Sequence, residues 1–545
     1  METPEGAAAD FARLLRAMKE RRKRSYEELS REALTSRSTL HRYCTGKGVP
    51  GDAETVSRIA RACGADAREI RELLEVWVSA CREREPPAEI IEPFGNPPAE
   101  FGNPPTEIVE PAGNARRPSL QWPALAVAVA LLALGVSASG VVPRSDAAPA
   151  PRAQRITGPA WAKHPKPVDP ELFGVTVASD TGLMPSFRVG AVRFWNSHSR
   201  WANVEPRPRR YDWATMDRLA EGAGRGGLDA MYVFGGTPAW AAPDSARMPF
   251  PDGSRSTGPD DLREWDGFVG AVASRYKGRF AAYEVWDSGF DHRLYTGTME
   301  QLVELTRRAG RAIRRADPEA RVVCPSMGRL QTPGSQAKLR RFARLGGFRH
   351  CDVMAVKEQA SPAVPPETML GGVRALTRVL NEFAISLPVW ETGPSYDDAF
   401  GGRLDEERSV NYAVRYFLTG LHADMYYVRR MFFYLWGKSN VPLTLQAVGG
   451  APTPAALAVD RLQRWLSGAL IRACGQGAPI GLPANVWQCE FVIAGRPAVI
   501  RWTHAGTAAV PAPAGAAAVD RLDGTRSPVR PGEPVQISER PVLIG

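Results

Sequence analysis

The chain has 545 residues, more than one hydrophobic core normally holds, so two or more domains are expected. Its hydrophobic fraction of 44% and charged fraction of 23% exclude a wholly disordered or fibrous protein, whereas its 47 prolines indicate linkers between folded parts. The net charge of +10 does not by itself establish nucleic-acid binding, because much of the arginine falls on predicted surface helices, where it is normally solvated.

Residues 1–82 are predicted to form an all-α helix-turn-helix domain. Apolar residues from Phe11 to Met18 recur at helical spacing, and Ser25 is placed to cap the next helix. The stretch SYEELSREALTSRSTLHRYCTGKGVP then gives a helix, a tight turn and a second helix opening at Ser36. The side chains expected to contact DNA from the start of that second helix are Arg37, Ser38, Thr39 and Arg42.

This segment resembles the lambda-repressor-like (xenobiotic-response-element type) regulators, especially actinomycete members with the run SRSTLHRYCxGxGVP. The resemblance covers residues 1–82 and implies that DNA is a partner of this domain. One alternative stays open, which is a helix-turn-helix fold reused as a protein-interaction module.

Residues 83–118 form a predicted acidic linker with repeated PPAE and GNPP units. Residues 119–142 contain the uncharged run WPALAVAVALLALGVSASGVV, which matches the roughly twenty residues that a helix needs to cross a bilayer. We therefore predict one transmembrane helix. Arg116 and Arg117 precede it, which favours a single-pass cell-membrane protein with a cytoplasmic N-terminus and an extracytoplasmic C-terminal half. Residues 143–170 form a second linker, rich in proline and alanine.

Residues 171–468 are predicted to form a (β/α)8 TIM barrel, because short apolar strands alternate with amphipathic helices. The eight predicted strands are FGVTVAS, AVRFWNS, LDAMYVFGG, AAYEVWDS, ARVVCPS, CDVMAVK, LPVWETG and RRMFFYLW. Residues 469–545 are expected to form a small β-sandwich-like accessory domain. Within it, Cys474 and Cys489 are close enough in sequence to close a short disulfide loop.

The barrel sequence resembles the clan A glycoside hydrolases, particularly β-xylosidase/iduronidase-like and cellulase-like members. VRFW resembles the arginine strand of that family, which implies that Arg193 orients the nucleophile, and PVWETG resembles the nucleophile strand, which implies that Glu391 is the nucleophile. The resemblance also implies a saccharide-binding role for three aromatic residues, namely Trp240, Trp286 and Trp436.

A retaining glycosidase needs two carboxyl groups about 5 Å apart, and the second one is missing from this pattern. Where the family carries Trp-Asn-Glu, this chain reads Trp286-Asp287-Ser288, and a serine hydroxyl cannot serve as the general acid. Lys357 is a second departure, because relatives commonly place a histidine and an aromatic residue at that strand end. The sequence therefore predicts a degenerate glycosidase barrel.

These patterns together predict a membrane-tethered transcriptional regulator, whose barrel binds a saccharide such as a cell-wall glycan while the helix-turn-helix binds DNA. Signal transmission would use a change in homodimerisation or proteolysis, and the sequence leaves open which. The alternative is a working retaining O-glycosyl hydrolase whose acid is supplied by Asp287 or Asp291. Glu358 is a third carboxyl near a strand end. No cofactor and no metal site are expected, since the cysteine and histidine spacings match none.

Overall fold

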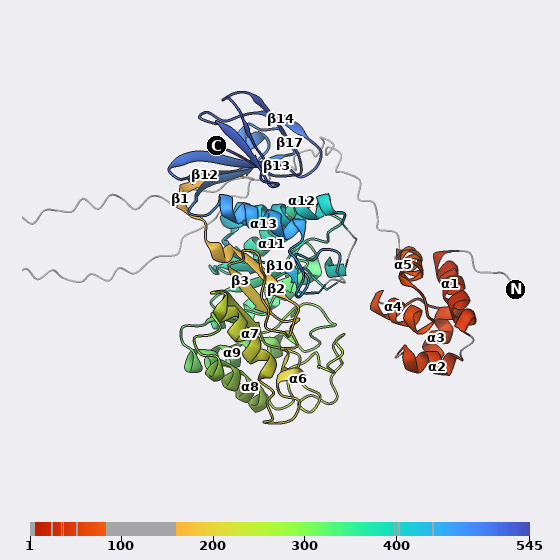
Figure 1. The fold of residues 1–545 in the computed structure, drawn as a ribbon. Helices are drawn as coiled ribbons and strands as arrows, with labels where there is room; N and C mark the ends of the chain where they lie inside the picture. The colour runs from red at the N-terminus through yellow and green to blue at the C-terminus, as the bar shows by residue number, and fades with distance from the viewer. Residues whose placement is uncertain are drawn as a thin grey trace, which may run out of the picture. The chain divides into compact units, whose positions relative to one another are not determined.

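The computed structural model describes residues 6–22, 25–33, 35, 37–50, 53–82, 160–396, 398–400, 404–438 and 441–545. The chain divides into two compact units, residues 1–139 and 140–545, and each is described by itself. Figure 1 shows the described helices of the first unit in red and orange, and the second unit in yellow through blue.

Within its described residues, the first unit is a bundle of five helices. They are α1 (Ala7–Arg22), α2 (Tyr26–Glu32), α3 (Arg37–Cys44), α4 (Ala53–Ala62) and α5 (Ala67–Arg82). Helix α2 begins with a capping box, in which the Ser25 hydroxyl accepts the Glu28 N–H at 3.2 Å and the Glu28 carboxylate accepts the Ser25 N–H at 2.9 Å. The helices enclose one apolar core, which includes Phe11, Leu15, Leu29, Leu40, Ile59 and Leu73.

The second unit contains a parallel sheet that is built from nine strand segments of the described chain. In chain order these are β2 (Phe173–Val177), β3 (Ala191–Phe194), β4 (Asp229–Val233), β5 (Ala282–Glu284), β6 (Arg321–Val323), β7 (Met327–Gly328), β8 (Met354–Lys357), β9 (Val389–Glu391) and β10 (Val428–Trp436). Most of these strands are buried along their whole length, as expected for parallel strands covered on both faces.

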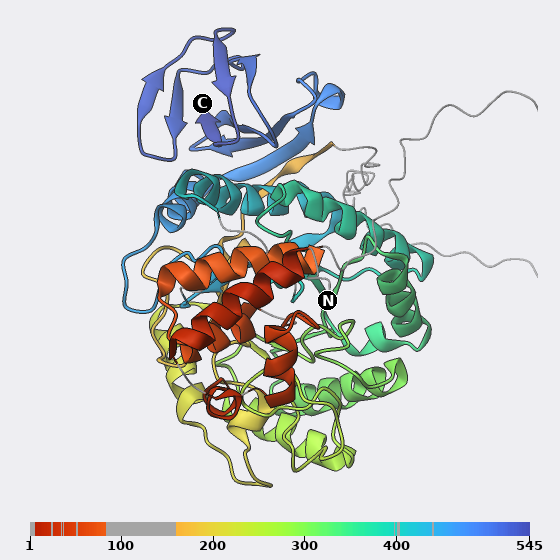
Figure 2. The ribbon, with the colours of Figure 1, turned by 90° about the vertical axis from the view of Figure 1, so that its right-hand side faces the viewer.

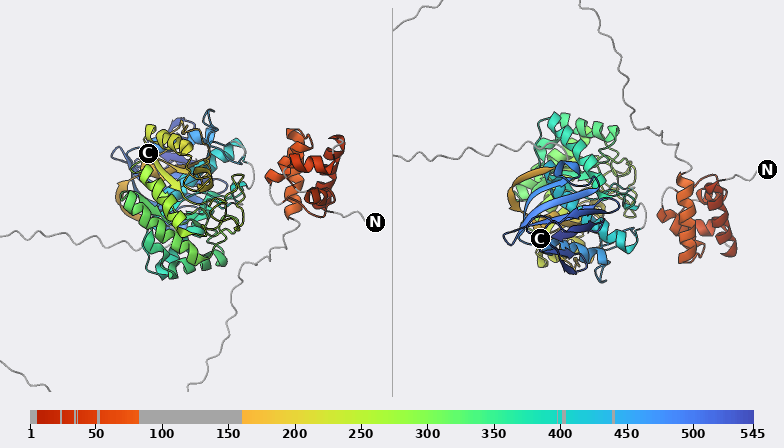
Figure 3. Two further views of the ribbon diagram at one scale, coloured as in Figure 1. Left: turned by 90° about the horizontal axis from the view of Figure 1, so that it is seen from below. Right: turned by 90° about the horizontal axis from the view of Figure 1, so that it is seen from above.

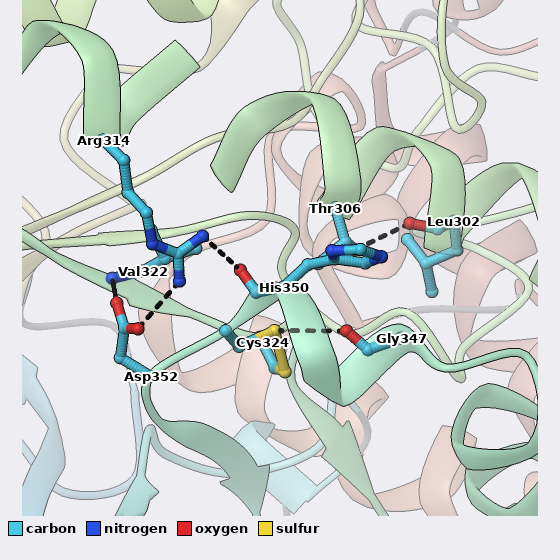
Figure 4. The surroundings of a disulfide bond; sticks show 9 residues. Leu302, Thr306, Arg314, Val322, Cys324, Gly347, His350 and Asp352 are labelled. Atoms are coloured by element: carbon cyan, nitrogen blue, oxygen red, sulfur yellow. Dashed lines mark hydrogen bonds and ion pairs between the residues drawn. A yellow bond between two sulfur atoms is a disulfide. The ribbon is translucent and has the colours of Figure 1, made fainter. Parts of the chain in front are cut away.

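The sheet closes into an eight-stranded barrel, because the short segments β6 and β7 together occupy one strand position. Two pairings close the barrel. The last strand, β10, pairs with the first, β2, and a bridge between Val323 of β6 and Val353, just before β8, joins the two ends of the sheet. The Cys324–Cys351 disulfide lies beside this bridge, where Cys324 N–H also donates to the Val353 carbonyl at 2.9 Å. Figure 4 shows the disulfide and its surroundings.

Helices follow the strands around the outside of the barrel (Figures 1 and 2). They are α6 (Trp201–Val204), α7 (Ala214–Arg225), α8 (Leu262–Arg275), α9 (Met299–Ala316), α10 (Pro333–Arg344), α11 (Met369–Glu382), α12 (Glu406–His422) and α13 (Pro454–Trp465). Short 3-10 helices include η2 (Gly347–His350) and η3 (Pro366–Thr368). Helix α9 shows why the outer α-helices form. Thr298 and Gln301 make a capping box at its start, and its buried residues recur at helical spacing, namely Leu302, Leu305, Ala309 and Ile313.

The remaining strands form a β-sandwich-like domain at one side of the barrel (Figures 1 to 3). An antiparallel sheet contains β1 (Trp161–Pro167), β11 (Leu470–Gln476), β12 (Val486–Ile493), β13 (Arg496–Thr503), β18 (Val542–Ile544), β15 (Ala518–Arg521) and β16 (Arg526–Pro528). Strands β14 (Ala508–Pro511) and β17 (Pro534–Ile537) form a two-stranded second layer. A separate apolar core with Val510 and Ile537 from the small layer joins the two sheets.

Two features of this domain bear on the predicted boundaries. Residues 161–167, which the sequence places in a linker, form β1 and pair with β11, so the chain enters the accessory sheet before it enters the barrel. The Cys474–Cys489 disulfide joins β11 to β12. The other face of the large sheet contributes Trp487 and Trp502 to the main barrel core.

The predicted transmembrane helix requires a correction. In the described part of the chain, no helix is both long and apolar enough to cross a membrane. The longest, α9, has 18 residues and carries five arginines and two glutamates, so it could not be desolvated in a bilayer. Residues 119–142 themselves lie outside the described residues. We therefore withdraw the transmembrane helix from the fold class, and with it the single-pass cell-membrane localisation.

Candidate functional site

The C-terminal ends of the barrel strands converge on a buried cluster of charged side chains. Asp287 follows β5, Lys357 ends β8, and Arg193 belongs to β3. The exposed fraction of each of these side chains is 5% or less. The cluster therefore lies inside the mouth of the barrel, where the sequence predicts the catalytic centre.

Asp287 is the centre of this cluster. One carboxylate oxygen, Oδ1, lies 2.5 Å from Arg193 Nη2 and 2.9 Å from Lys357 Nζ. The other, Oδ2, accepts the Ser288 hydroxyl at 3.0 Å. Burial opposes ionisation of this carboxyl, but Lys357 and Arg193 together hold its pKa below the ordinary value. The two cations therefore favour the ionised form of Asp287, which has no proton to deliver.

Arg193 contacts two carboxylates of the β5 region. Its Nε donates to Glu284 Oε2 at 2.8 Å and its Nη2 contacts Asp287, so the guanidinium is engaged by β5 and its C-terminal extension. Burial raises the pKa of Glu284, although the neighbouring Arg193 guanidinium acts to lower it. Sequence analysis missed Glu284, although the alternation of side chains along β5 could have placed it inside the barrel.

Ser288, which the sequence resemblance places at the acid/base position, directly follows Asp287 in the turn after β5. It is buried, and its backbone is left-handed with φ of 55°, an uncommon conformation for a non-glycine residue. The Ser288 N–H donates to Ser326 Oγ at 2.8 Å, which fixes the turn after β5. With its hydroxyl bonded to Asp287, this residue supplies no titratable proton.

Glu391, the predicted nucleophile, ends β9 and is also buried. Its carboxylate accepts three backbone N–H groups, from Glu358 at 2.9 Å, Gln359 at 3.2 Å and Gly393 at 2.9 Å. Burial, with a contribution from the neighbouring Glu358 carboxyl, raises the pKa of Glu391 to about 8 despite these donors. At neutral pH a carboxyl of this kind is mostly protonated and is a poor nucleophile.

The other two carboxyls are engaged by neighbouring groups. Asp291 forms an ion pair with Arg293 at 2.5 Å. The Glu358 Oε1 accepts the Leu330 N–H at 2.8 Å. The Glu358 carboxyl also packs so closely against α11 that a Cβ added to Gly372 would collide with it. Burial raises the pKa of Glu358 to about 8.

The tryptophans expected to bind saccharide differ in exposure. Trp286 and Trp436 are at most 1% exposed, and their indole N–H groups donate to the Leu294 carbonyl and to Gln446. Trp240 is only partly buried, and its N–H donates to the Glu205 carbonyl at 2.9 Å. Only Trp240 among the three leaves part of its ring open to a ligand.

A long loop after β4 closes over this end of the barrel. Asp252 from the loop pairs with the buried Arg200 at 2.6 Å, and the guanidinium lies 3.9 Å from the centroid of the Phe250 ring. Phe250 in turn packs edge-on against Trp195. Sequence analysis missed the Arg200–Asp252 pair, because the partners lie 52 residues apart.

No group of three or more histidine, cysteine, aspartate or glutamate side chains is placed to hold a metal ion in the described ranges.

In the first unit, α3 presents the residues predicted to bind DNA. Arg37 and Arg42 are exposed, Thr39 is half-buried, and Ser38 lies in α3 with its side chain outside the described part. Leu40 and Cys44 face inward and anchor the helix in the core. His41, which the sequence analysis did not single out, is exposed on α3 and packs edge-on against Tyr26 at 5.3 Å.

Residues 21–24 are four consecutive basic residues that begin inside α1, and they are only partly described. Arg21 forms an ion pair with Glu69 of α5 at 2.5 Å, so this guanidinium ties α1 to α5. Residues 23–24 lie outside the described residues.

A family model described as a helix-turn-helix domain matches residues 10–73. The N-terminal unit contains a helix-turn-helix domain. Helices α2 and α3 of this domain form the motif that the sequence predicts at the same place. No curated protein matches the chain significantly in sequence.

The barrel unit is similar in fold to solved glycoside hydrolases. A family 39 glycoside hydrolase from the gut symbiont Bacteroides cellulosilyticus is 16% identical, over 69% of this chain and 80% of that one, with a TM-score of 0.52. A monomeric beta-xylosidase from Caulobacter crescentus is 15% identical, over 70% of this chain and 97% of that one, with a TM-score of 0.49. The first likeness shows that the second unit has a glycoside hydrolase-like fold, and at this identity it shows the fold alone.

Proposed function

We propose that this chain is a DNA-binding regulator whose glycosidase-like barrel binds a saccharide without hydrolysing it. The observation that carries the second half is the locked Asp287 carboxylate, which lies between Lys357 and Arg193 beside a serine at the acid/base position. The first half is supported by the helix-turn-helix family match and by the exposed arginines of α3.

The arrangement at the barrel mouth does not favour the rival function, a retaining hydrolase with an atypical acid. Such an acid must be protonated and must reach the glycosidic oxygen. Asp287 is ionised by its two cationic partners, and Asp291 is paired with Arg293. The barrel would therefore recognise a sugar through its rim, where Trp240 keeps part of its ring exposed.

DNA binding is tested with the full chain. A duplex would first be selected from a random pool, and its affinity would then be measured for the native chain and for Arg37→Ala/Arg42→Ala. Loss of base or phosphate contacts from these side chains is expected to weaken binding by about tenfold or more. Arg61→Ala, an exposed arginine at the end of α4, is the matched control and is expected to bind normally. Equal affinity of all three proteins for the selected duplex would overturn the proposal.

Saccharide binding is tested by probing a glycan array with the full chain and with Trp240→Ala. We expect retention of one glycan class by the native chain, reduced retention by the variant, and no release of sugar on prolonged incubation. Absence of any glycan signal would contradict the saccharide half of the proposal while leaving DNA binding untouched.

A further inference from the structure

The outer helices α9, α10 and α11, together with η2, carry an excess of positive charge. These elements are neighbours, because α9 contacts α10 and η2, and α10 contacts α11. Helices α9, α10 and α11 contain only three acidic residues among them, and η2 contains none. The same elements contain eleven arginines and one lysine.

All three acidic residues are already paired with arginines. Glu304 binds Arg307 and Arg308. Glu382 lies 2.8 Å from Arg340, and Glu300 contacts Arg341. Arg314 is also neutralised, because its guanidinium reaches the Asp352 carboxylate at 2.8 Å and the His350 carbonyl (Figure 4).

The arginines left over define what we call the basic face. Each is exposed, and no carboxylate of a described residue lies within ion-pair distance of it. They are Arg311, Arg315, Arg344, Arg349, Arg374 and Arg378. Burial and the surrounding guanidinium groups, Arg349 among them, lower the pKa of His350, which agrees with an excess of positive charge around η2.

Stabilisation of helix ends does not account for this excess. Basic side chains in the last turn favour a helix, which explains Arg315 in α9 and Arg344 in α10. Arg311 and Arg378 lie before the last turns of α9 and α11, where that benefit is lost. Unpaired arginines on adjacent helices are well suited to bind phosphate groups, because each guanidinium can donate two parallel hydrogen bonds.

We propose that the basic face binds the phosphate backbone of duplex DNA and adds sequence-independent affinity to the helix-turn-helix domain. This inference rests on the proposed DNA-binding function, which makes duplex DNA the polyanion that this chain meets. Backbone contacts by arginine carry no sequence information, but they raise affinity and make it sensitive to salt.

The experiment measures the affinity of the full chain for the selected duplex and for an unrelated duplex between 50 and 300 mM NaCl. The test variant is Arg311→Ser/Arg315→Ser/Arg349→Ser. Its control removes the same charge from exposed positions of the accessory domain, as Arg472→Ser/Arg496→Ser/Arg530→Ser. Thermal unfolding of both variants should match the native chain, since all six side chains are on the surface.

The logarithm of the association constant falls with the logarithm of salt concentration by about 0.9 per phosphate contact. The test variant is therefore expected to lose roughly two to three units of slope on both duplexes, whereas the control keeps the native slope. An unchanged slope, or the same loss in the control, would overturn the inference. A loss of heparin binding without loss of DNA binding would also overturn it, because the face would then serve an acidic polysaccharide.

Failure of this inference can be distinguished from failure of the proposed function. If Arg37→Ala/Arg42→Ala still abolishes recognition of the selected duplex while the triple variant keeps its slope, only the basic face is refuted. If no duplex binds at any salt concentration, both proposals are refuted together.

Discussion

The ammonium group of Lys357 lies 2.9 Å from the carboxylate of Asp287, across the mouth of the barrel. Sequence analysis predicts two departures from the glycosidase pattern, at Lys357 and at the Asp287–Ser288 stretch, and the Ser288 hydroxyl donates to the same carboxylate. The departures therefore form one interacting set. The charge of Asp287 is compensated by Lys357 and Arg193, inside a core that would not hold an uncompensated charge.

Lys357→Met is expected to destabilise the chain by on the order of 3 kcal/mol, because it removes one of the two cations that compensate the buried Asp287. Adding Asp287→Asn to this variant should restore at least half of the loss, since the neutral amide needs no counter-charge. Urea unfolding of the two single variants and the double variant gives the coupling between them. Additive losses would show that the pair does not interact as described.

Stability should fall as the pH rises from about 5 to about 8 and change little above that value. Burial raises the pKa of Glu358 and of Glu391 to about 8, so the folded chain holds protons that the unfolded chain releases near the ordinary value of 4.5. The two protonated carboxyls contribute fully to the free energy of unfolding below their ordinary pKa of 4.5, and this contribution is lost as the pH rises through 8. Glu358→Gln should weaken the decline, whereas Glu319→Gln, an exposed control, should follow the native profile. A flat native profile in denaturant titrations from pH 6 to 9 would refute the shifts.

The two disulfides should differ in their contribution to stability. Loop-closure entropy predicts a loss of roughly 3.5 kcal/mol for Cys324→Ser/Cys351→Ser and roughly 3 kcal/mol for Cys474→Ser/Cys489→Ser. The difference follows from their sequence separations of 27 and 15 residues. Denaturant unfolding with and without a reductant measures both values, and the reductant should have less effect on each variant. A larger effect of the shorter loop would contradict the entropic account.

Glu367 is expected to hold the accessory domain on the barrel. Its carboxylate accepts two hydrogen bonds from the buried Arg415 of α12 and one from the Trp502 indole of β13. Glu367→Gln should therefore cost about 3 kcal/mol, because it leaves a buried guanidinium poorly compensated. Glu539→Gln removes the partly exposed partner of the same arginine and should cost less than about 1 kcal/mol. Calorimetry on the full chain would separate the two, and equal losses would argue against this role for Glu367.

Much of the fold was predictable because its signals are local. The Ser25–Glu28 capping box and the apolar spacing of α1 predict the start of the helix-turn-helix domain, and the alternation of strands and helices predicts the barrel. By contrast, β1 pairs with a strand some 300 residues away, as Trp161 with Cys474, so no local signal distinguishes it from the linker. The long apolar run at residues 119–142 suggested a membrane span that the described helices do not support.

The site was less predictable because its contacts join distant strands. The sequence cannot distinguish a strand-end tryptophan that stacks on a sugar from one that packs in the core. Trp436 is buried, and its indole N–H donates to Gln446. The arginine strand was recognisable, but the partners of Arg193 depend on Glu284 and Asp287, both about 90 residues further along the chain. A side-chain pattern alone could not choose between these carboxylates and Glu391.

The most direct test of the central claim, that the barrel no longer hydrolyses glycosides, is to incubate the full chain with aryl glycosides bearing good leaving groups. Such substrates need little protonation, so they would reveal a surviving nucleophile even without an acid. We predict no release of the aryl group above background, and the same result for Glu391→Gln. Turnover by the native chain that Glu391→Gln abolishes would contradict the claim and identify the barrel as a working enzyme.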